Sequence, residues 1–391
     1  MHALRVRGAV LALVGGTLFA LALLPGHAHP ADPVSQGPTG GESVPCASSD
    51  AAMPRGLAVE LPPGATDPAR ILRNLEAVRN PFMSAVAMQV NWRDLEPVQG
   101  QFDWSRLDAL FAAAESANKW VILEPAPGFF SPAWALRGAQ TDTFEIQYGP
   151  AHGTSAPLPM PWDRVYLQRW FTFVKQLAGR YGRSPAFRMI GAAGPTSVST
   201  EFTLPSSLPP ANRKWFRDGY TPAKYVAAWE DAFQVYADAF PNQCISLAGP
   251  NVPILKRGRT DPVERQKGRQ DMVERAVRAF GRRLALQSND LHAGRAAVEA
   301  HDDTDFINSY SGRIITGFMM RGGSLGAVPS QVMGAAGDPP LALRRSIDKG
   351  MAPNKAGQHV MYLEINAGDV LAPEMQPVLQ YGASLLAPKR Q

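Results

Sequence analysis

Residues 84–124 read SAVAMQVNWRDLEPVQGQFDWSRLDALFAAAESANKWVILE. The apolar segment 84–92 predicts a buried strand, and Asp103 is placed to cap a helix over 104–119. A second short apolar run, 120–124, predicts another strand. A strand, a helix and a strand in this order are typical of one unit of a parallel sheet.

The same alternation continues from Arg55 to the end of the chain. Eight strands are expected, at residues 56–61, 84–92, 120–124, 186–192, 243–248, 284–288, 314–320 and 359–365. Eight strand–helix units match an α/β fold consisting of a single (β/α)8 TIM barrel with long βα loops. The alternative is a doubly wound open sheet, which usually has a glycine-rich phosphate turn where this chain has Leu61-Pro62-Pro63-Gly64.

Three segments organise the chain of 391 residues. Residues 1–28 resemble a secretory signal peptide, with Arg5 and Arg7 ahead of an apolar run that is short of the roughly 20 residues a membrane span needs. Residues 29–53 form a Gly- and Pro-rich arm or linker, and 54–391 form the barrel. The expectation is a secreted or periplasmic monomer without stable membrane insertion after cleavage; the alternative is an uncleaved anchor.

The two cysteines exclude a disulfide scaffold and a cysteine-built metal site. Cys46 precedes the first strand and Cys244 begins the fifth, so both are expected at the N-terminal end of a parallel barrel. There they form either a disulfide or two unpaired thiols. The histidines are scattered, so no metal site is expected. The sequence also lacks a phosphate-binding loop, so no cofactor is expected. The formal charge of +5 is weak support for nucleic acid as a partner. The basic stretch 256–269 either contacts an acidic polysaccharide or forms a solvated loop.

Chemistry in such barrels is located at the C-terminal ends of the strands and on the loops that follow. The long loops 125–161 and 196–220 carry aromatic side chains, and several strands end with a carboxylate. A pair of carboxylates in an aromatic cleft is typical of glycosidic bond cleavage.

The segment Asn91-Trp92-Arg-Asp-Leu-Glu96-Pro97-Val-Gln-Gly100-Gln-Phe102-Asp103 resembles a motif of barrel glycosidases related to the β-galactosidases and cellulases, the clan A-like superfamily. Residues 123–125 and 131–134 resemble the third-strand segment of the same enzymes, and the similarity covers 54–135. This resemblance implies an acid/base Glu after an Asn at the end of strand four and a nucleophile Glu at the end of strand seven. The chain has neither, and the nearest carboxylates are Glu201 and Glu364. In this motif, Glu96 is expected to shape the rim.

We therefore predict an exported glycosidase, with retention expected, that cleaves a polysaccharide or oligosaccharide. Glu201 is the predicted acid/base and Glu364 the nucleophile or base; the alternative for Glu364 is a structural salt bridge with an Arg such as Arg93. The predicted substrate-binding residues are Trp92, Arg93, Glu124, Phe130, Trp134, Asp290, His292 and Tyr310. The rivals are a non-catalytic carbohydrate-binding barrel and a polysaccharide lyase that uses Tyr310, His292 and Arg321.

Overall fold

The computed structural model describes residues 45–61, 74–147, 151–197, 200–294 and 303–388. The expected signal peptide and most of the expected arm lie outside these ranges. The described residues all belong to one compact unit of the chain, Gln36–Gln391. Within the described residues, no helix combines the length and the apolar character that a membrane crossing requires.

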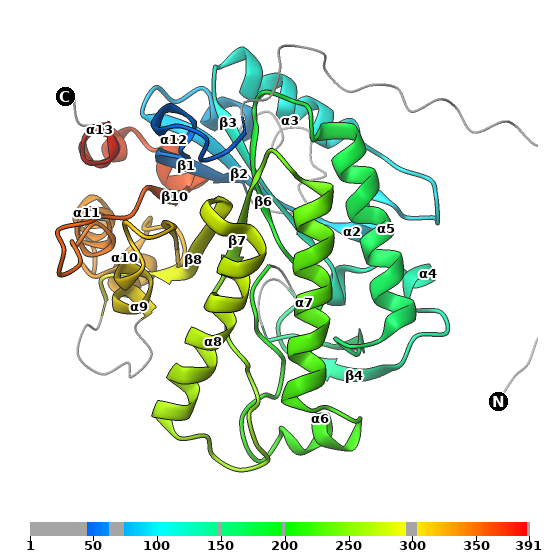
Figure 1. Ribbon diagram of the computed structural model, residues 1–391. Helices are drawn as coiled ribbons and strands as arrows, with labels where there is room; N and C mark the ends of the chain where they lie inside the picture. Colours follow the sequence, from blue (N-terminus) through cyan, green and yellow to red (C-terminus); the bar gives the residue numbers. More distant parts are fainter. Residues whose placement is uncertain (1–44, 62–73, 148–150, 198–199, 295–302, 389–391) are drawn as a thin grey trace, which may run out of the picture. The chain divides into compact units, whose positions relative to one another are not determined.

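Eight parallel strands form a closed barrel, which confirms the predicted α/β TIM-barrel fold (Figure 1). In spatial order around the ring they are β1 (Gly56–Leu61), β2 (Met83–Asn91), β3 (Trp120–Ala126), β6 (Phe187–Gly191), β7 (Cys244–Ala248), β8 (Leu284–Leu291), β9 (Ile315–Met320) and β10 (Tyr362–Asn366). The eighth strand pairs with the first, Ala58 lying beside Glu364. The predicted strand count is therefore confirmed, and Glu364 lies on strand eight.

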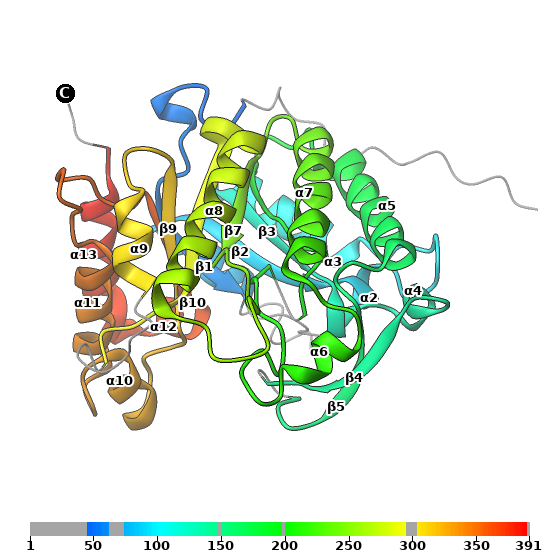
Figure 2. The same ribbon diagram turned by 60° about the horizontal axis from the view of Figure 1, so that its bottom comes forward.

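Helices cover the outer surface of the barrel, and α5, α7 and α8 line one flank side by side (Figures 1 and 2). The longer helices are α3 (Ser105–Ser116), α5 (Arg164–Tyr181), α7 (Pro222–Ala239), α8 (Pro262–Phe280), α11 (Pro339–Gly350) and α13 (Gln376–Leu386). The shorter ones are α2 (Trp92–Leu95), α4 (Ala133–Leu136), α6 (Arg213–Arg217), α9 (Asp303–Ser309), α10 (Ala327–Met333) and α12 (Ala367–Leu371). Polar side chains cap several first turns, as Asp163 does for α5 and Thr221 for α7.

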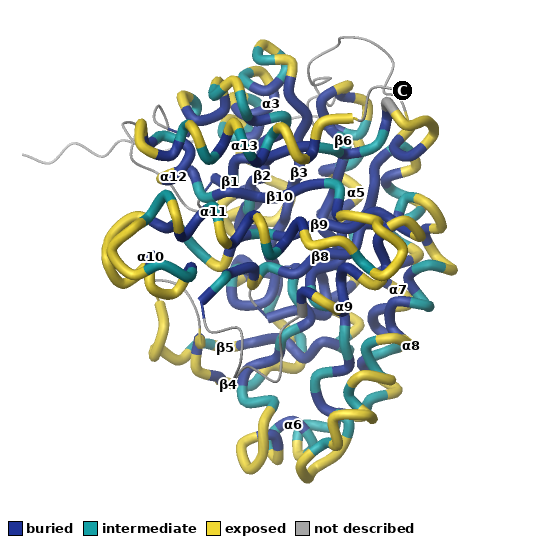
Figure 3. Tube along the Cα trace, turned by 90° about the vertical axis from the view of Figure 1, so that its left-hand side faces the viewer, coloured by how far each residue is buried: buried dark blue, intermediate teal, exposed yellow. Residues whose placement is uncertain are grey.

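Strand residues alternate between two cores, because successive side chains of a strand point to opposite faces. Leu57 and Val59 pack outward under the helices, whereas Ala58 points into the barrel. Figure 3 shows the strands buried at the centre, with exposed positions on the surrounding helices and loops. This alternation gives the inner surface its own set of side chains, distinct from the apolar outer core.

The inner core combines alanines and a few larger aliphatic side chains with two large rings. Trp120 and Tyr362 lie edge to face, 6.4 Å apart, near the starts of their strands. A Cβ on Gly317 would lie 2.3 Å from the Tyr362 ring, so this ring occupies the space of a side chain from strand seven. The Tyr362 hydroxyl donates a hydrogen bond to Gln287 Oε1 at 2.6 Å. The rings fill the N-terminal half of the barrel and leave its carboxyl ends to polar groups.

A disulfide joins Cys46 to Cys244, with Cα atoms 5.4 Å apart. The backbone N–H of Cys46 also donates to the carbonyl of Asn242 at 2.8 Å. The sequence left open whether the two cysteines form a disulfide or remain unpaired thiols, and the structure has the disulfide. The bridge ties the segment before β1 to the start of β7, at the end of the barrel opposite the strand carboxyl ends.

Candidate active site

Three glutamates from three strands point into the barrel near its C-terminal end. Glu60 lies on β1, Glu124 on β3 and Glu364 on β10. Glu364 is 0% exposed and Glu124 is 4% exposed. Charge repulsion from Glu124 raises the pKa of Glu364, and repulsion from Glu60 raises the pKa of both. Glutamates from three separate strands thus converge on one enclosed space.

Burial is the main cause of the unusual acidities of this cluster. Burial raises the pKa of Glu124 to about 8, and repulsion from Glu60 and then Glu201 adds to it. Burial also holds the pKa of Glu364 well above its usual range, and repulsion from Glu124 and Glu60 acts in the same direction. Glu124 therefore retains its proton at neutral pH, so the site holds a carboxylic acid that can donate a hydrogen bond.

The buried carboxyl oxygens have little to bond to inside the protein. Neither Glu364 Oε1 nor Glu364 Oε2 has a hydrogen-bond partner among the described residues, and Glu124 Oε1 has none either. Arg93 does not pair with Glu364, because its guanidinium lies 3.9 Å from Asp94 and 5.3 Å from the centre of the Phe130 ring. The salt-bridge alternative for Glu364 is therefore wrong with respect to Arg93. Buried acceptors without partners are costly, and such groups call for a functional explanation.

Glu201 reaches the barrel by an indirect route. β6 ends at Gly191, which pairs with Ser246 of β7. The chain then leaves the sheet and returns, so that Glu201 forms a parallel bridge with Ala248, two residues further along β7. The backbone N–H of Phe202 also donates to the Ala248 carbonyl at 3.3 Å. Glu201 therefore lies beside β7 where a direct continuation of β6 would run.

Gly191 makes room for this return. A Cβ at Gly191 would lie 2.5 Å from Thr200 Cγ2 and 3.4 Å from Glu124 Cγ. A larger residue would push away the segment that carries Glu201, and it would also press on Glu124. The absence of a side chain at the end of strand four is thus what lets Glu124 and the Thr200–Glu201 segment lie next to each other.

The loop after β3 is fixed to the loop after β6. Gly128, with φ +65°, donates its N–H to the Tyr166 hydroxyl at 2.8 Å, and Phe129 donates its N–H to the Ser197 carbonyl at 2.8 Å. A Cβ on Gly128 would lie 2.2 Å from that same carbonyl oxygen. Phe130 follows at the rim, only partly buried, with Arg93 over its ring. Two of the predicted binding residues, Arg93 and Phe130, therefore lie together at the barrel mouth.

Residues of the motif 91–103 support the rim through buried hydrogen bonds and ring contacts. Glu96 accepts hydrogen bonds from Trp92 Nε1 at 2.9 Å and from the Gly100 N–H at 2.8 Å, and Trp134 Nε1 donates to the Glu96 carbonyl at 3.0 Å. The Trp92 and Trp134 rings meet edge to face at 5.4 Å. Glu96 shapes the rim as expected. Trp92 and Trp134 are buried in the wall that supports the rim rather than exposed as sugar platforms.

Part of the chain is similar to a family of glycosidases. The family described as beta-galactosidase, glycoside hydrolase family 42, matches residues 63–238. This match and the closed barrel make the chain similar to the clan A-like (β/α)8 glycoside hydrolases. No curated protein matches the sequence.

Two of the solved structures that share this barrel fold are a β-galactosidase and a GH5_18 protein. The β-galactosidase from the psychrophilic Marinomonas ef1 is 12% identical with a TM-score of 0.52, and the match covers 84% of this chain and 59% of that one. A GH5_18 protein from Streptomyces cattleya, solved with GlcNAc, is 10% identical with a TM-score of 0.51, over 90% of this chain and 82% of that one. The chain thus spans about three fifths of the length of the Marinomonas protein, and at these identities the likeness concerns the fold alone.

A second polar group lies at the ends of β8 and β9. Arg321 Nε lies 3.3 Å from Asp290 Oδ1, and Arg321 Nη1 lies 3.2 Å from His292 Nε2. The structure thus brings the predicted binding residues Asp290 and His292 together through Arg321. Tyr310 is not part of this group, because it precedes β9 and therefore lies at the N-terminal end of that strand, against Phe306. Tyr310, His292 and Arg321, which the lyase alternative requires in one site, therefore do not lie together.

Two features of the site were given no role by the sequence predictions, although Glu60 stood among the ionisable groups near strand ends. Glu60 alternates with the buried Val59 and Leu61 on β1, and this pattern could have identified it in the same way as Glu364. The return of Thr200 to Gly191 has no local signal, because it depends on contacts between distant loops.

In the described part of the chain, no group of three or more His, Cys, Asp or Glu side chains is arranged to hold a metal ion.

Proposed function

We propose that the protein is an exported glycosidase that cleaves O-glycosidic bonds of a polysaccharide or oligosaccharide with two carboxylates. Glu201 is the general acid/base, and Glu364 is the nucleophile or the base. The observation that carries the proposal is the gathering of protonatable carboxyl groups from β1, β3, β10 and the returning loop at one end of the barrel.

The chemistry needs one carboxylic acid to protonate the leaving oxygen and one carboxylate to attack the anomeric carbon or activate a water. Glu201, at the place of a continued strand four, is the acid/base of the proposal. Glu124 lies close to it and, with a pKa of about 8, keeps its proton at neutral pH and donates a hydrogen bond to a sugar hydroxyl. A carboxyl separation of about 5–5.5 Å gives retention, and roughly 6.5–9.5 Å gives inversion.

A non-catalytic carbohydrate-binding barrel is the second candidate function. Two observations favour it: strand four ends without an Asn-Glu pair, and Glu364 is completely enclosed. Such a protein would bind the same saccharides at the rim without cleaving them. Binding and cleavage therefore have to be measured separately.

The experiment is the release of reducing ends from a panel of polysaccharides by the purified chain from residue 29. Glu201→Gln, Glu364→Gln and Glu124→Gln are compared with Glu145→Gln, an exposed glutamate on the β4–β5 hairpin (Thr141–Glu145, Ser155–Pro159). The proposal predicts that the first two variants lose at least a hundredfold in kcat without a lower Tm, while Glu145→Gln keeps its activity. Normal cleavage by both variants would refute the assignment, and binding without any cleavage would establish the second candidate.

Export is supported by the signal-like segment 1–28 and by the Cys46–Cys244 disulfide, since such bridges persist in oxidising compartments. The measurement is the N-terminal mass of the protein recovered from the extracytoplasmic fraction of its host. A mature chain beginning near residue 29 is expected, and a full-length chain confined to the cytoplasm would contradict export.

A further inference from the structure

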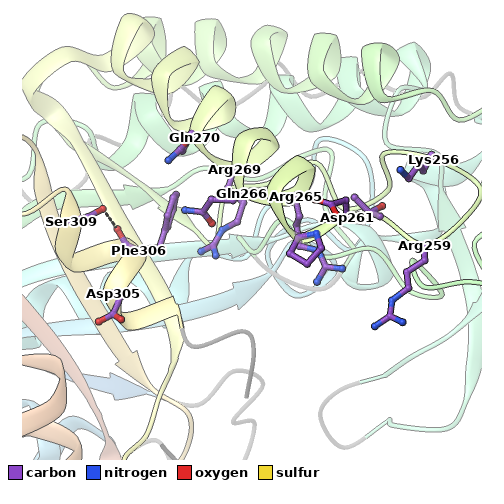
Figure 4. A pocket seen from close by; sticks show the side chains of 12 residues that line it. Lys256, Arg259, Asp261, Arg265, Gln266, Arg269, Gln270, Asp305, Phe306 and Ser309 are labelled. Atoms are coloured by element: carbon purple, nitrogen blue, oxygen red, sulfur yellow. Dashed lines mark hydrogen bonds between the residues drawn. The ribbon is translucent and has the colours of Figure 1, made fainter. Parts of the chain in front are cut away.

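A groove lined with basic side chains runs along the rim away from the carboxylates. One part, of about 900 Å³, lies between the first turns of α8 and the helix α9 (Figure 4). An adjoining part, of about 850 Å³, is lined by residues 202–204 and by the segment after β7. The two parts share Lys256, Arg259, Thr260, Arg265 and Arg269, which makes them one groove. Its lining begins at Phe202, one residue after Glu201.

One face of α8 supplies much of this lining. Arg265 and Arg269 are four residues apart, so they lie on the same side of the helix, and Gln266 and Gln270 lie beside them. In Figure 4, the Arg265 and Arg269 side chains extend from α8 into the groove. Four residues of a helix advance about 6 Å, which is comparable with the length of one sugar residue in a chain. This face of α8 therefore presents cations and amides at a spacing close to that of successive sugar residues in a chain.

The charge of the groove is positive. Four cations line its larger part, against the carboxylates of Asp261 and Asp305. Asp261 is occupied as the cap of α8, where it accepts from the Val263 N–H at 2.7 Å. Lys256 is paired with Glu264 at 2.6 Å, whereas Arg259 is exposed on the opposite wall. The arginines thus set the sign of the groove.

We propose that this groove binds an anionic saccharide chain, one that carries carboxylate or sulfate groups, and leads it to the site at Glu201. The inference rests on the proposed function, whose substrate class it specifies. Arginine binds planar or tetrahedral oxyanions through paired N–H donors, and the glutamine amides suit sugar hydroxyls. The Arg269 guanidinium covers one face of the Phe306 ring at 3.9 Å, and the residue is 7% exposed, so the ring offers little surface for a nucleobase to stack on.

The test compares affinities of the wild-type chain by calorimetry. The probes are oligogalacturonate for carboxylates, chondroitin sulfate oligosaccharides for sulfates, neutral xylo-oligosaccharides, and single-stranded DNA as a polyanion without sugar-ring hydroxyl arrays. An anionic saccharide is expected to bind at least tenfold more tightly than the neutral one, and more tightly than DNA, with affinity falling as salt rises. Equal binding of neutral and anionic saccharides, or tighter binding of DNA, would overturn the inference.

Matched variants locate the binding. Arg259→Gln combined with Arg265→Gln removes two cations from the groove while Arg269 keeps its packing on Phe306. Arg278→Gln removes one exposed cation from the far end of the same helix. The double variant is expected to lose about tenfold or more in affinity for the anionic saccharide, and Arg278→Gln less than twofold. Equal affinities in all three proteins would overturn the inference.

The two proposals fail in different ways. Cleavage of neutral saccharides that the double variant leaves unchanged would refute the anionic groove and leave the glycosidase intact. Tight, arginine-dependent binding of an anionic saccharide without cleavage would refute the glycosidase and leave the groove intact.

Discussion

Replacement of Glu124 by Gln should make the protein more stable at alkaline pH. The Glu124 side chain is 4% exposed, and its pKa is raised from 4.5 to about 8. Because the folded protein holds a proton that the unfolded chain releases, the stabilisation is complete below about pH 4.5 and is lost as pH rises toward about 8. Each pH unit is equivalent to about 1.4 kcal/mol, so the total is at most about 5 kcal/mol.

Glutamine has nearly the same shape and does not ionise, so Glu124→Gln escapes this loss. The assay is urea unfolding of wild type, Glu124→Gln and Glu145→Gln at a series of pH values from 4.5 to 9. The unfolding free energy of Glu124→Gln relative to wild type should rise by up to about 5 kcal/mol across the series. Glu145→Gln, at an exposed position, should follow wild type throughout. A difference for Glu124→Gln that stays constant with pH would refute the buried, protonated carboxyl.

Three further substitutions test the supports of the site. The double change Cys46→Ser, Cys244→Ser removes a disulfide between residues 198 positions apart in the sequence. It should lower the free energy of unfolding, measured with urea, by roughly 2–5 kcal/mol. An unchanged free energy of unfolding would argue against the disulfide. Gly317→Ala places a Cβ 2.3 Å from the Tyr362 ring and should cost about 1–3 kcal/mol, whereas Gly322→Ala, with nothing within 4 Å, should cost less in the same assay. Glu96→Ala leaves Trp92 Nε1 and the Gly100 N–H without their acceptor and should lower Tm by an amount equivalent to about 2–4 kcal/mol; a smaller loss than for Glu145→Ala would contradict the rim role.

The barrel could be predicted from the sequence because its signals are local. Apolar runs of strand length alternate with helical repeats, although the cap predicted at Asp103 was one residue early, because α3 begins at Ser105 with Trp104 at the N-cap position. Glu364 and Glu124 can likewise be recognised as carboxylates within apolar strands. The roles of Trp92 and Trp134 could not be predicted, because a ring in a loop looks the same whether it packs inward or lies open.

The position of Glu201 could be suspected from its proximity in sequence to strand four, but its bridge to Ala248 could not. That bridge depends on a loop that leaves the sheet and returns, and no short-range pattern encodes the path. Tyr310 was misplaced for a different reason: the predicted strand 314–320 already began after it, which puts Tyr310 at the N-terminal end of the barrel, away from the rim.

The most direct measurement is a crystal structure of the Glu364→Gln protein with an oligosaccharide bound. We expect a glycosidic oxygen next to the carboxyl group of Glu201, the substituted side chain at position 364 on the other side of the same sugar, and the two side-chain termini within about 10 Å of each other. A saccharide bound away from both residues, or a separation too large for one sugar or one water to bridge, would contradict the two-carboxylate mechanism.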